Sequence, residues 1–159
     1  MDGSIVFPTR LATGHRPPNL LRQTTRHEVA VAAVSARYLA AGFEWARDRK
    51  PEAFLDHQAD GVASRDGRID LVEIELTPKS WQRYKQILAN HSSRLEMGDV
   101  SSIAYFCTSR ADRAVRRESD RFMFQRDREL LVSAVTFDEG GAWIAESTVV
   151  NLPVAALHE

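Results

Sequence analysis

The strongest constraint on the fold is a short apolar segment, residues 71–76, in which two acidic side chains alternate with apolar ones. Side chains of a β-strand point to opposite faces in turn, so the alternation predicts a strand with Glu73 and Glu75 on one face. The other face would carry Val72, Ile74 and Leu76. Two ionised carboxylates roughly 6.6 Å apart repel by about 2.5 kcal/mol at an effective dielectric of about 20. We therefore expect a cation beside them, and Mg²⁺ or Mn²⁺ suits carboxylate oxygens.

The first half of the chain shows one helical pattern followed by three strand patterns. Thr25 and Glu28 match a capping box, and apolar residues at helical spacing continue to Gly42, which predicts a helix. Alternating apolar and polar residues predict strands over residues 43–47, 59–64 and 69–76. Asp66 and Gly67 lie between the last two strands and favour the positive backbone angles of a tight hairpin turn.

The second half predicts two more helices and the remaining strands. Thr77 followed by Pro78 indicates the start of a helix with Thr77 as its N-cap, and Gly98 ends that region. A near-continuous apolar run over 102–107 is typical of a buried central strand. A charged helix over about 111–122, a strand over 130–137 and a short last strand at 143–144 follow. The order of elements indicates an α/β fold.

The length of 159 residues, of which 43% are hydrophobic, fits one globular domain. We expect an extended or flexible arm over residues 1–22, an α/β domain over 23–145 and a tail over 146–159. The N-terminus lacks a basic region followed by an apolar stretch, and no apolar run reaches membrane-spanning length. The sequence therefore predicts a soluble, cytoplasmic protein without a membrane partner.

Cysteine and histidine usage bounds the metal chemistry. The single cysteine, Cys107, excludes an intramolecular disulfide and any paired-cysteine zinc motif. None of the five histidines has the spacing that places two ligands on one helical face, so the sequence predicts no zinc site. These histidines are His15, His27, His57, His91 and His158.

The net charge of −1 gives no global attraction to nucleic acid. Only three of the 21 basic residues are lysine, and many arginines fall between residues 110 and 128. Two interpretations stay open, since the arginines are either a phosphate-binding patch or a solvated surface encoded by a GC-rich genome.

The element order and the acidic residues resemble the PD-(D/E)xK nuclease superfamily. That resemblance implies a restriction-endonuclease-like αβββαβ core, with a mixed central sheet flanked by helices. It covers roughly residues 24–108. Within the superfamily, residues 73–80 together with Arg83 and Tyr84 most resemble the nuclease-like domain of bacterial replication-relaxation proteins.

Carried over by position, the resemblance implies that Asp60 and Glu73 hold Mg²⁺ or Mn²⁺ and that Glu28, on the first helix, joins them. The lysine that the family places two residues after Glu73 is Glu75 here, and Ala59 stands where the family usually has proline. The resemblance implies that Lys79 can take the part of that lysine.

The expected chemistry is phosphodiester hydrolysis by activated water. Asp60, Glu73, Glu75 and Lys79 form the candidate catalytic set, in which the first two hold the metal. Glu75 would extend the cage or act as general base, and Lys79 would stabilise phosphate charge. Nucleic acid would contact Lys79 and two residues three and four positions further along the helix, Gln82 and Arg83.

Each of these residues also has a plain structural interpretation. Glu28 would serve the capping box, and Asp60 would be a turn residue. Lys79 and Glu75 would form an ordinary surface ion pair, or Glu73 and Glu75 would both face water from an edge strand. Gln82 and Arg83 would be merely solvated.

Three functions remain open from the sequence. The first is a Mg²⁺-dependent endonuclease that hydrolyses DNA. The second is a catalytically inactive nuclease-fold protein that binds DNA or serves as an accessory subunit in plasmid or phage DNA handling. The third is an interaction subunit with no nucleic-acid role. Replication-relaxation proteins usually carry a DNA-binding helical domain that this chain is too short to contain. Targeting would therefore come from a separate chain, and a homodimer is a further expected partnership.

Overall fold

A computed structural model describes residues 22–52 and 56–145. The tail predicted over 146–159 and, apart from Arg22, the arm predicted over 1–22 lie outside the described residues. Within the described residues, no helix is both long and apolar enough to span a bilayer.

The described chain folds as an α/β domain, as predicted. Its elements are α2 (Gln23–Ala40), β1 (Glu44–Ala46), β2 (Gly61–Arg65), β3 (Arg68–Glu75), α3 (Trp81–Met97), β4 (Ser102–Thr108), α4 (Ser109–Phe122), α5 (Gln125–Arg128) and β5 (Leu131–Phe137). The predicted order of a helix, three strands, a helix and a strand is confirmed. The short helix α5 was not predicted.

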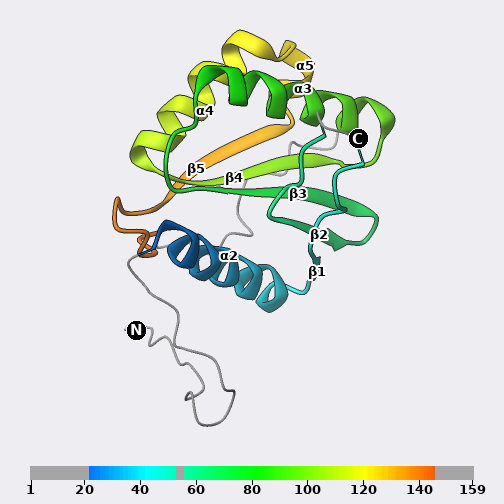
Figure 1. The fold of residues 1–159 in the computed structure, drawn as a ribbon. Helices are drawn as coiled ribbons and strands as arrows, with labels where there is room; N and C mark the ends of the chain where they lie inside the picture. Colours follow the sequence, from blue (N-terminus) through cyan, green and yellow to red (C-terminus); the bar gives the residue numbers. More distant parts are fainter. Residues whose placement is uncertain (1–21, 53–55, 146–159) are drawn as a thin grey trace.

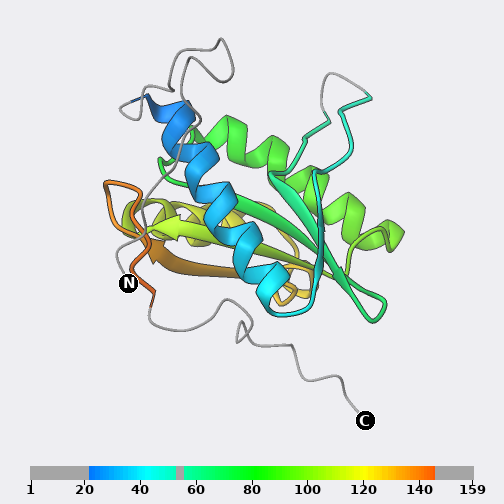
Figure 2. The ribbon, with the colours of Figure 1, turned by 90° about the horizontal axis from the view of Figure 1, so that it is seen from below.

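The five strands form one open, mixed sheet in the order β1-β2-β3-β4-β5 (Figure 1). β1, β2 and β3 pair antiparallel, whereas β4 runs parallel to both β3 and β5. In place of the predicted last strand, Trp143 forms an isolated bridge with Phe137. The helix α2 covers one face of the sheet and α3, α4 and α5 cover the other, as the view in Figure 2 also shows.

The two faces of β3 differ as predicted. Val72, Ile74 and Leu76 belong to the apolar cluster under α2. Leu71 belongs to the cluster under α3 and α4. Because side chains alternate along a strand, Glu73 and Glu75 point to the face covered by α3 and α4. The carboxylates therefore lie under protein and not toward open water.

The tight turn between β2 and β3 is confirmed. Asp66 and Gly67 both adopt positive φ, at 52° and 81°. These angles match the two-residue hairpin turn that suits the twist of antiparallel strands. The turn fixes the register in which Gly61 lies opposite Val72, and that register decides where Asp60 comes to lie.

The predicted helix starts are wrong at both long helices. The helix α2 begins at Gln23, and its N-cap, Arg22, makes no side-chain capping bond, so Thr25 and Glu28 do not form the capping box. The helix α3 begins at Trp81 with Ser80 as N-cap, whose hydroxyl accepts the N–H of Arg83. Ser80 offers the same capping chemistry as Thr77, and the residues between them remain outside the helix.

Candidate functional site

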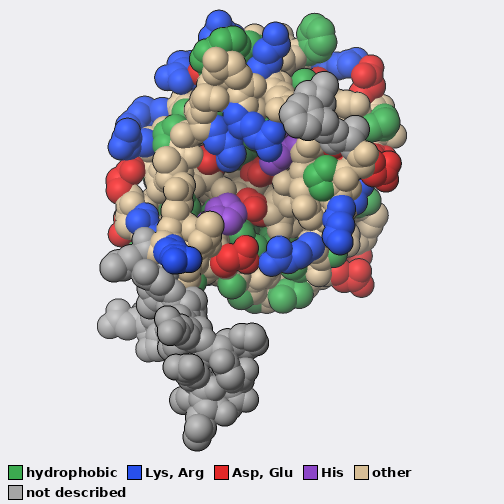
Figure 3. Space-filling model, viewed as in Figure 1, with side chains coloured by type: hydrophobic (Ala, Val, Ile, Leu, Met, Phe, Trp, Pro, Cys, Tyr) green, Lys and Arg blue, Asp and Glu red, His purple; other side chains and the backbone are tan. Residues whose placement is uncertain are grey.

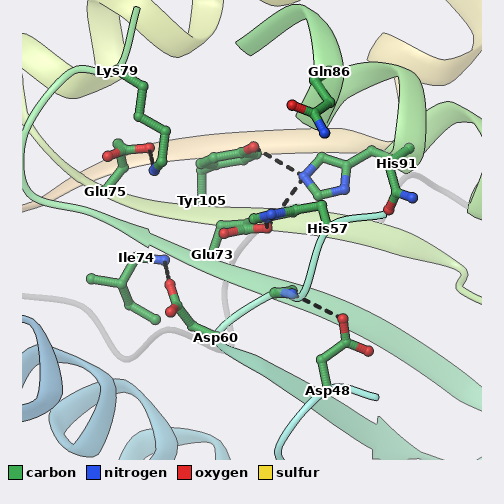
Figure 4. A network of polar contacts seen from close by, with 12 residues as sticks. Asp48, His57, Asp60, Glu73, Ile74, Glu75, Lys79, Gln86, His91 and Tyr105 are labelled. Carbon is green, nitrogen blue, oxygen red and sulfur yellow. Dashed lines mark hydrogen bonds and ion pairs between the residues drawn. The ribbon is translucent and has the colours of Figure 1, made fainter. Parts of the chain in front are cut away.

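Asp60 lies where β2 begins, against the neighbouring strand β3 (Figure 4). Its backbone N–H donates to the carbonyl of Val72 at 3.1 Å. Its carboxylate accepts the backbone N–H of Ile74 through Oδ2 at 2.7 Å. The Ile74 N–H of β3 is therefore paired with this side chain and not with a backbone carbonyl of β2. Asp60 is thus more than a turn residue.

The other carboxylate oxygen of Asp60, Oδ1, contacts the helix α2. His27 Nε2, from α2, lies 2.7 Å from Oδ1 of Asp60. This hydrogen bond raises the pKa of His27, and burial opposes the rise. The helix residue that reaches Asp60 is therefore His27 and not its neighbour Glu28.

Glu28 lies at the rim of the site. Its carboxylate pairs with Arg47 at 3.2 Å, and both side chains are exposed, at 61% and 75%. It lines a cavity of about 130 Å³ together with Asp60. It also lines a cavity of about 400 Å³ together with Glu75 and Lys79. Glu28 thus lines one cavity with Asp60 and another with Glu75 and Lys79, and no hydrogen bond among the described residues joins it to Asp60 or Glu73.

The segment before Asp60 is fixed by a buried ion pair. Asp48 accepts the backbone N–H of Ala59 at 2.9 Å and pairs with Arg94, from α3, at 2.7 Å. Both charged side chains are almost fully buried. Arg94 therefore ties the start of β2 to α3, and sequence reasoning assigned no role to either member of this pair.

Glu73 is 4% exposed and lies between two histidines. Its Oε1 is 2.6 Å from Nε2 of His57 and 3.4 Å from Nε2 of His91. The same nitrogen of His91 lies 3.0 Å from the hydroxyl of Tyr105. Burial raises the pKa of Glu73, and the hydrogen bond to His57 opposes the rise. Burial also holds the pKa of His91 well below its ordinary value, so this ring is neutral at pH 7.

Glu75 is equally buried and pairs with Lys79, whose Nζ hydrogen-bonds to Oε2. Burial raises the pKa of Glu75, and the charge of Lys79 opposes the rise. Lys79 belongs to the extended segment before α3. The pair is part-buried, and thus differs from a fully solvated surface ion pair.

The prediction that Lys79 shares a helix face with Gln82 and Arg83 is wrong, because α3 begins only at Trp81. Gln82 and Arg83 are both exposed. The guanidinium of Arg83 turns toward the histidine cluster and lies 3.4 Å from Nδ1 of His57.

Three of the predicted residues, Glu28, Glu75 and Lys79, border an open groove. The cavity of about 400 Å³ lies between the start of α2, the end of β3 and the segment leading to α3. Glu75 and Lys79 form its charged wall, and His27 and Glu28 face them. The face in Figure 3 shows acidic and histidine side chains around a hollow bordered by basic side chains.

His57, Glu73 and His91 bring potential metal-ligating atoms within 4.8 Å of one another. They are the one group of three such side chains within residues 22–52 and 56–145. The predicted ligands Glu28, Asp60 and Glu73 do not form such a group in the described part of the chain. The sequence did not predict this group, because His57 and His91 lie 34 positions apart and on different elements and so lack the close spacing of a zinc motif. The available signal was that His91 follows Tyr84, Ile87 and Leu88 at helical spacing, which marks the buried face of α3.

Comparison of the chain with protein-family models, with curated proteins and with solved structures found no match.

Proposed function

We propose that the chain is a metal-dependent endonuclease that hydrolyses DNA phosphodiester bonds, built on the restriction-endonuclease-like core of the PD-(D/E)xK superfamily. The elements α2, β1, β2, β3, α3 and β4 follow one another in the αβββαβ order of that core. The replication-relaxation nuclease-like domain is the member that the residues around Glu73 resemble most.

One observation carries this proposal, namely the attachment of Asp60 to the strand that bears Glu73 and Glu75. The register sets Gly61 opposite Val72, so Asp60 comes next to Glu73 across the two strands. The hydrogen bond to the Ile74 N–H then holds the Asp60 carboxylate at the edge of β3. Three carboxylates from two neighbouring strands thereby lie at one end of the sheet.

The oxygens around Asp60 and Glu73 suit a hard divalent ion. Oε2 of Glu73 and Oε1 of Glu75 receive no hydrogen bond from any residue that the structure describes. Both carboxylates are buried at a cost that a cation would offset. Mg²⁺ or Mn²⁺ held by Asp60 and Glu73, with Glu28 at the rim, would lower the pKa of a bound water and neutralise phosphate oxygens.

The remaining residues would act directly on the water and the phosphate. Glu75 would accept a proton from the attacking water when that water lies within hydrogen-bond distance. Lys79 would exchange its bond to Glu75 for one to a phosphate oxygen, which frees Glu75 at the same moment. Gln82 and Arg83, exposed at the start of α3, would contact the nucleic-acid backbone.

The test is cleavage of plasmid, linear and single-stranded DNA by purified protein with Mg²⁺, Mn²⁺ or a chelator. We expect cutting with either ion, and a loss of about 10²-fold or more in Asp60→Asn and Glu73→Gln. Asp66→Asn is the matched control, because Asp66 is an exposed acid of the β2–β3 turn, and it should cut like the wild type. Wild-type protein that cuts no DNA with either ion would rule the proposal out.

A second function is favoured by the pairing of Glu75 with Lys79. The position at which the family has a lysine is an acid here, and the nearest lysine is engaged by that acid. A nuclease-fold protein that binds DNA without cutting it, as an accessory subunit in plasmid or phage DNA handling, would accommodate both facts. It predicts DNA retention that Glu73→Gln leaves unchanged. Absence of retention even at low salt would favour an interaction subunit with no nucleic-acid role.

We further propose that DNA targeting comes from a separate chain or from a homodimer. A net charge of −1 supplies little attraction to DNA by itself. Light scattering of the purified chain, with and without DNA, reports its oligomeric state.

A further inference from the structure

The cluster of His57, Glu73 and His91 combines three separate parts of the fold in one buried place. His57 comes from the segment between β1 and β2, Glu73 from β3 and His91 from α3. Their exposed fractions are 9%, 4% and 0%. Two imidazoles converge on one carboxylate, and neither imidazole has a part in the cleavage chemistry proposed above.

The separations in this cluster approach those of a metal centre. Zinc bonds to histidine nitrogen and carboxylate oxygen are about 2.0–2.1 Å, so two ligands of a tetrahedral ion lie about 3.3 Å apart. His91 Nε2 and Glu73 Oε1 are already 3.4 Å apart. His57 Nε2 and the same oxygen are 2.6 Å apart, the distance of a hydrogen bond with one shared proton. Replacement of that proton by an ion requires His57 Nε2 and Glu73 Oε1 to separate by about 0.7 Å.

His57 is the member of the cluster that regular secondary structure holds least. It belongs to no helix or strand, whereas Glu73 and His91 are held in β3 and α3. The hydroxyl of Tyr105, 3.0 Å from His91 Nε2, borders the same space and can hydrogen-bond to a water that completes the coordination. The close-up in Figure 4 shows the rings of His57 and His91 beside Glu73, with the Tyr105 hydroxyl pointing toward His91.

We propose that His57, Glu73 and His91 form a second ion site, which binds a divalent transition metal of the Zn²⁺ type. Imidazole nitrogen selects zinc and its first-row neighbours over Mg²⁺, which prefers oxygen ligands. The site goes beyond the proposed nuclease function, because none of its contacts involves Asp60. Glu73 is common to both sites, with Oε1 facing the histidines and Oε2 left for an ion beside Asp60.

Metal binding has a consequence for Arg83. A neutral imidazole that binds the ion through Nε2 carries its proton on Nδ1. The guanidinium of Arg83, 3.4 Å from Nδ1 of His57, can donate only to an unprotonated nitrogen. Loading of the site therefore turns Arg83 away, and a nearby positive charge opposes the ion. Removal of Arg83 should tighten metal binding.

The test is a zinc titration of the full chain after treatment with a chelator, followed by calorimetry. We expect one equivalent of Zn²⁺ to bind, and a loss of affinity of about 10-fold or more in His57→Gln and in His91→Gln. Arg83→Ala should bind more tightly than Lys85→Ala, which removes another exposed cation of α3. His27→Gln is the matched histidine control, and it should bind like the wild type.

X-ray absorption of the zinc-loaded wild type supplies a readout that does not depend on any variant. We expect two imidazoles in the coordination shell. Because His91 is fully buried, circular dichroism must first show that each variant is folded. If His91→Gln does not fold, the zinc affinity of His57→Gln and the absorption spectrum of the wild type test the proposal. Wild-type protein without zinc affinity, unchanged affinity in His57→Gln, or a shell without imidazole would each overturn the proposal.

Failure of this site and failure of the proposed nuclease are distinguishable. Asp60→Asn should abolish Mg²⁺-dependent cleavage and leave the zinc affinity unchanged. His57→Gln should lose the zinc affinity in the absence of DNA and Mg²⁺. An equal loss of zinc affinity in Asp60→Asn would contradict a separate site.

Discussion

The carboxylate of Asp60 accepts the backbone N–H of Ile74 at 2.7 Å, across the boundary between two strands. Glu73 and Glu75 flank Ile74 in β3 and point to the face covered by α3 and α4. Asp60, held by the backbone of β3, thus lies beside Glu73 and Glu75, which belong to β3 itself. Concentration of negative charge in a buried place costs stability, and the proposed cation would offset that cost.

Glu73→Gln should stabilise the metal-free protein at pH 8. Burial raises the pKa of Glu73 above its unfolded value, so the proton is bound more tightly in the folded state. The stability that comes from this proton is present below the unfolded pKa and is lost as pH rises through the folded pKa. At pH 8 the wild type therefore carries a penalty that glutamine avoids, and we expect a gain of about 1 kcal/mol. Urea unfolding in chelator measures it.

The gain in Glu73→Gln should shrink as the pH falls through the raised pKa of folded Glu73, and it should be absent below the unfolded value of 4.5. Addition of metal should reverse the order at pH 8, because only the wild type then gains binding energy. A variant less stable than the wild type at pH 8 without metal would contradict the burial argument.

His27 should stabilise the fold more at low pH than at high pH. Its hydrogen bond to Asp60 raises its pKa, so its contribution is fully present below about pH 6.5 and disappears as pH rises through the higher folded pKa. The difference in unfolding free energy between wild type and His27→Gln should therefore be larger at pH 5.5 than at pH 8.5. Asp60→Asn, which removes the charged partner, should show the same pH trend. A difference independent of pH would disprove the coupling.

Arg94→Met should destabilise the protein by about 3–5 kcal/mol, because it leaves Asp48 buried without its partner. The double variant with Asp48→Asn should recover part of that loss, since the uncompensated charge is gone. Lys85→Met, at an exposed position of α3, is the control and should stay within about 0.5 kcal/mol of the wild type. Chemical denaturation of the wild type, Arg94→Met, Asp48→Asn and the double variant measures the coupling energy between the pair.

Gly61→Ala should disturb the start of β2. A Cβ at this position would lie 2.1 Å from the ring of Trp45, so either the ring or the strand must shift. We expect a loss of about 1–3 kcal/mol. Trp45→Leu opens space there, so Gly61→Ala should cost less in that background. Equal costs in both backgrounds would show that the ring does not set the requirement for glycine.

The fold could be predicted because its signals are local. Period-two alternation marked β3 and its two faces, and Asp66 with Gly67 marked the hairpin. Helix starts were less certain, because Thr77 and Ser80 offer the same capping hydroxyl within one turn of each other. Sequence alone does not decide between two equivalent caps when packing makes the choice.

The site could be predicted only in part, because its contacts are not local. The helical spacing of α2 did indicate His27. This residue lies three positions before Ala30 and seven before Val34, which places it on the buried side of the helix. The resemblance pointed instead to Glu28, which faces outward. Nothing local indicates that His57 meets His91, because the loop and helix that carry them meet only in the folded chain.

The most direct test of the account is a crystal of the chain soaked in Mn²⁺, with the ion located by its anomalous scattering. The account predicts a peak bonded, at about 2 Å, to a carboxylate oxygen of Asp60 and to Oε2 of Glu73. A map without a peak beside Asp60, whether or not an ion lies between His57 and His91, would contradict it.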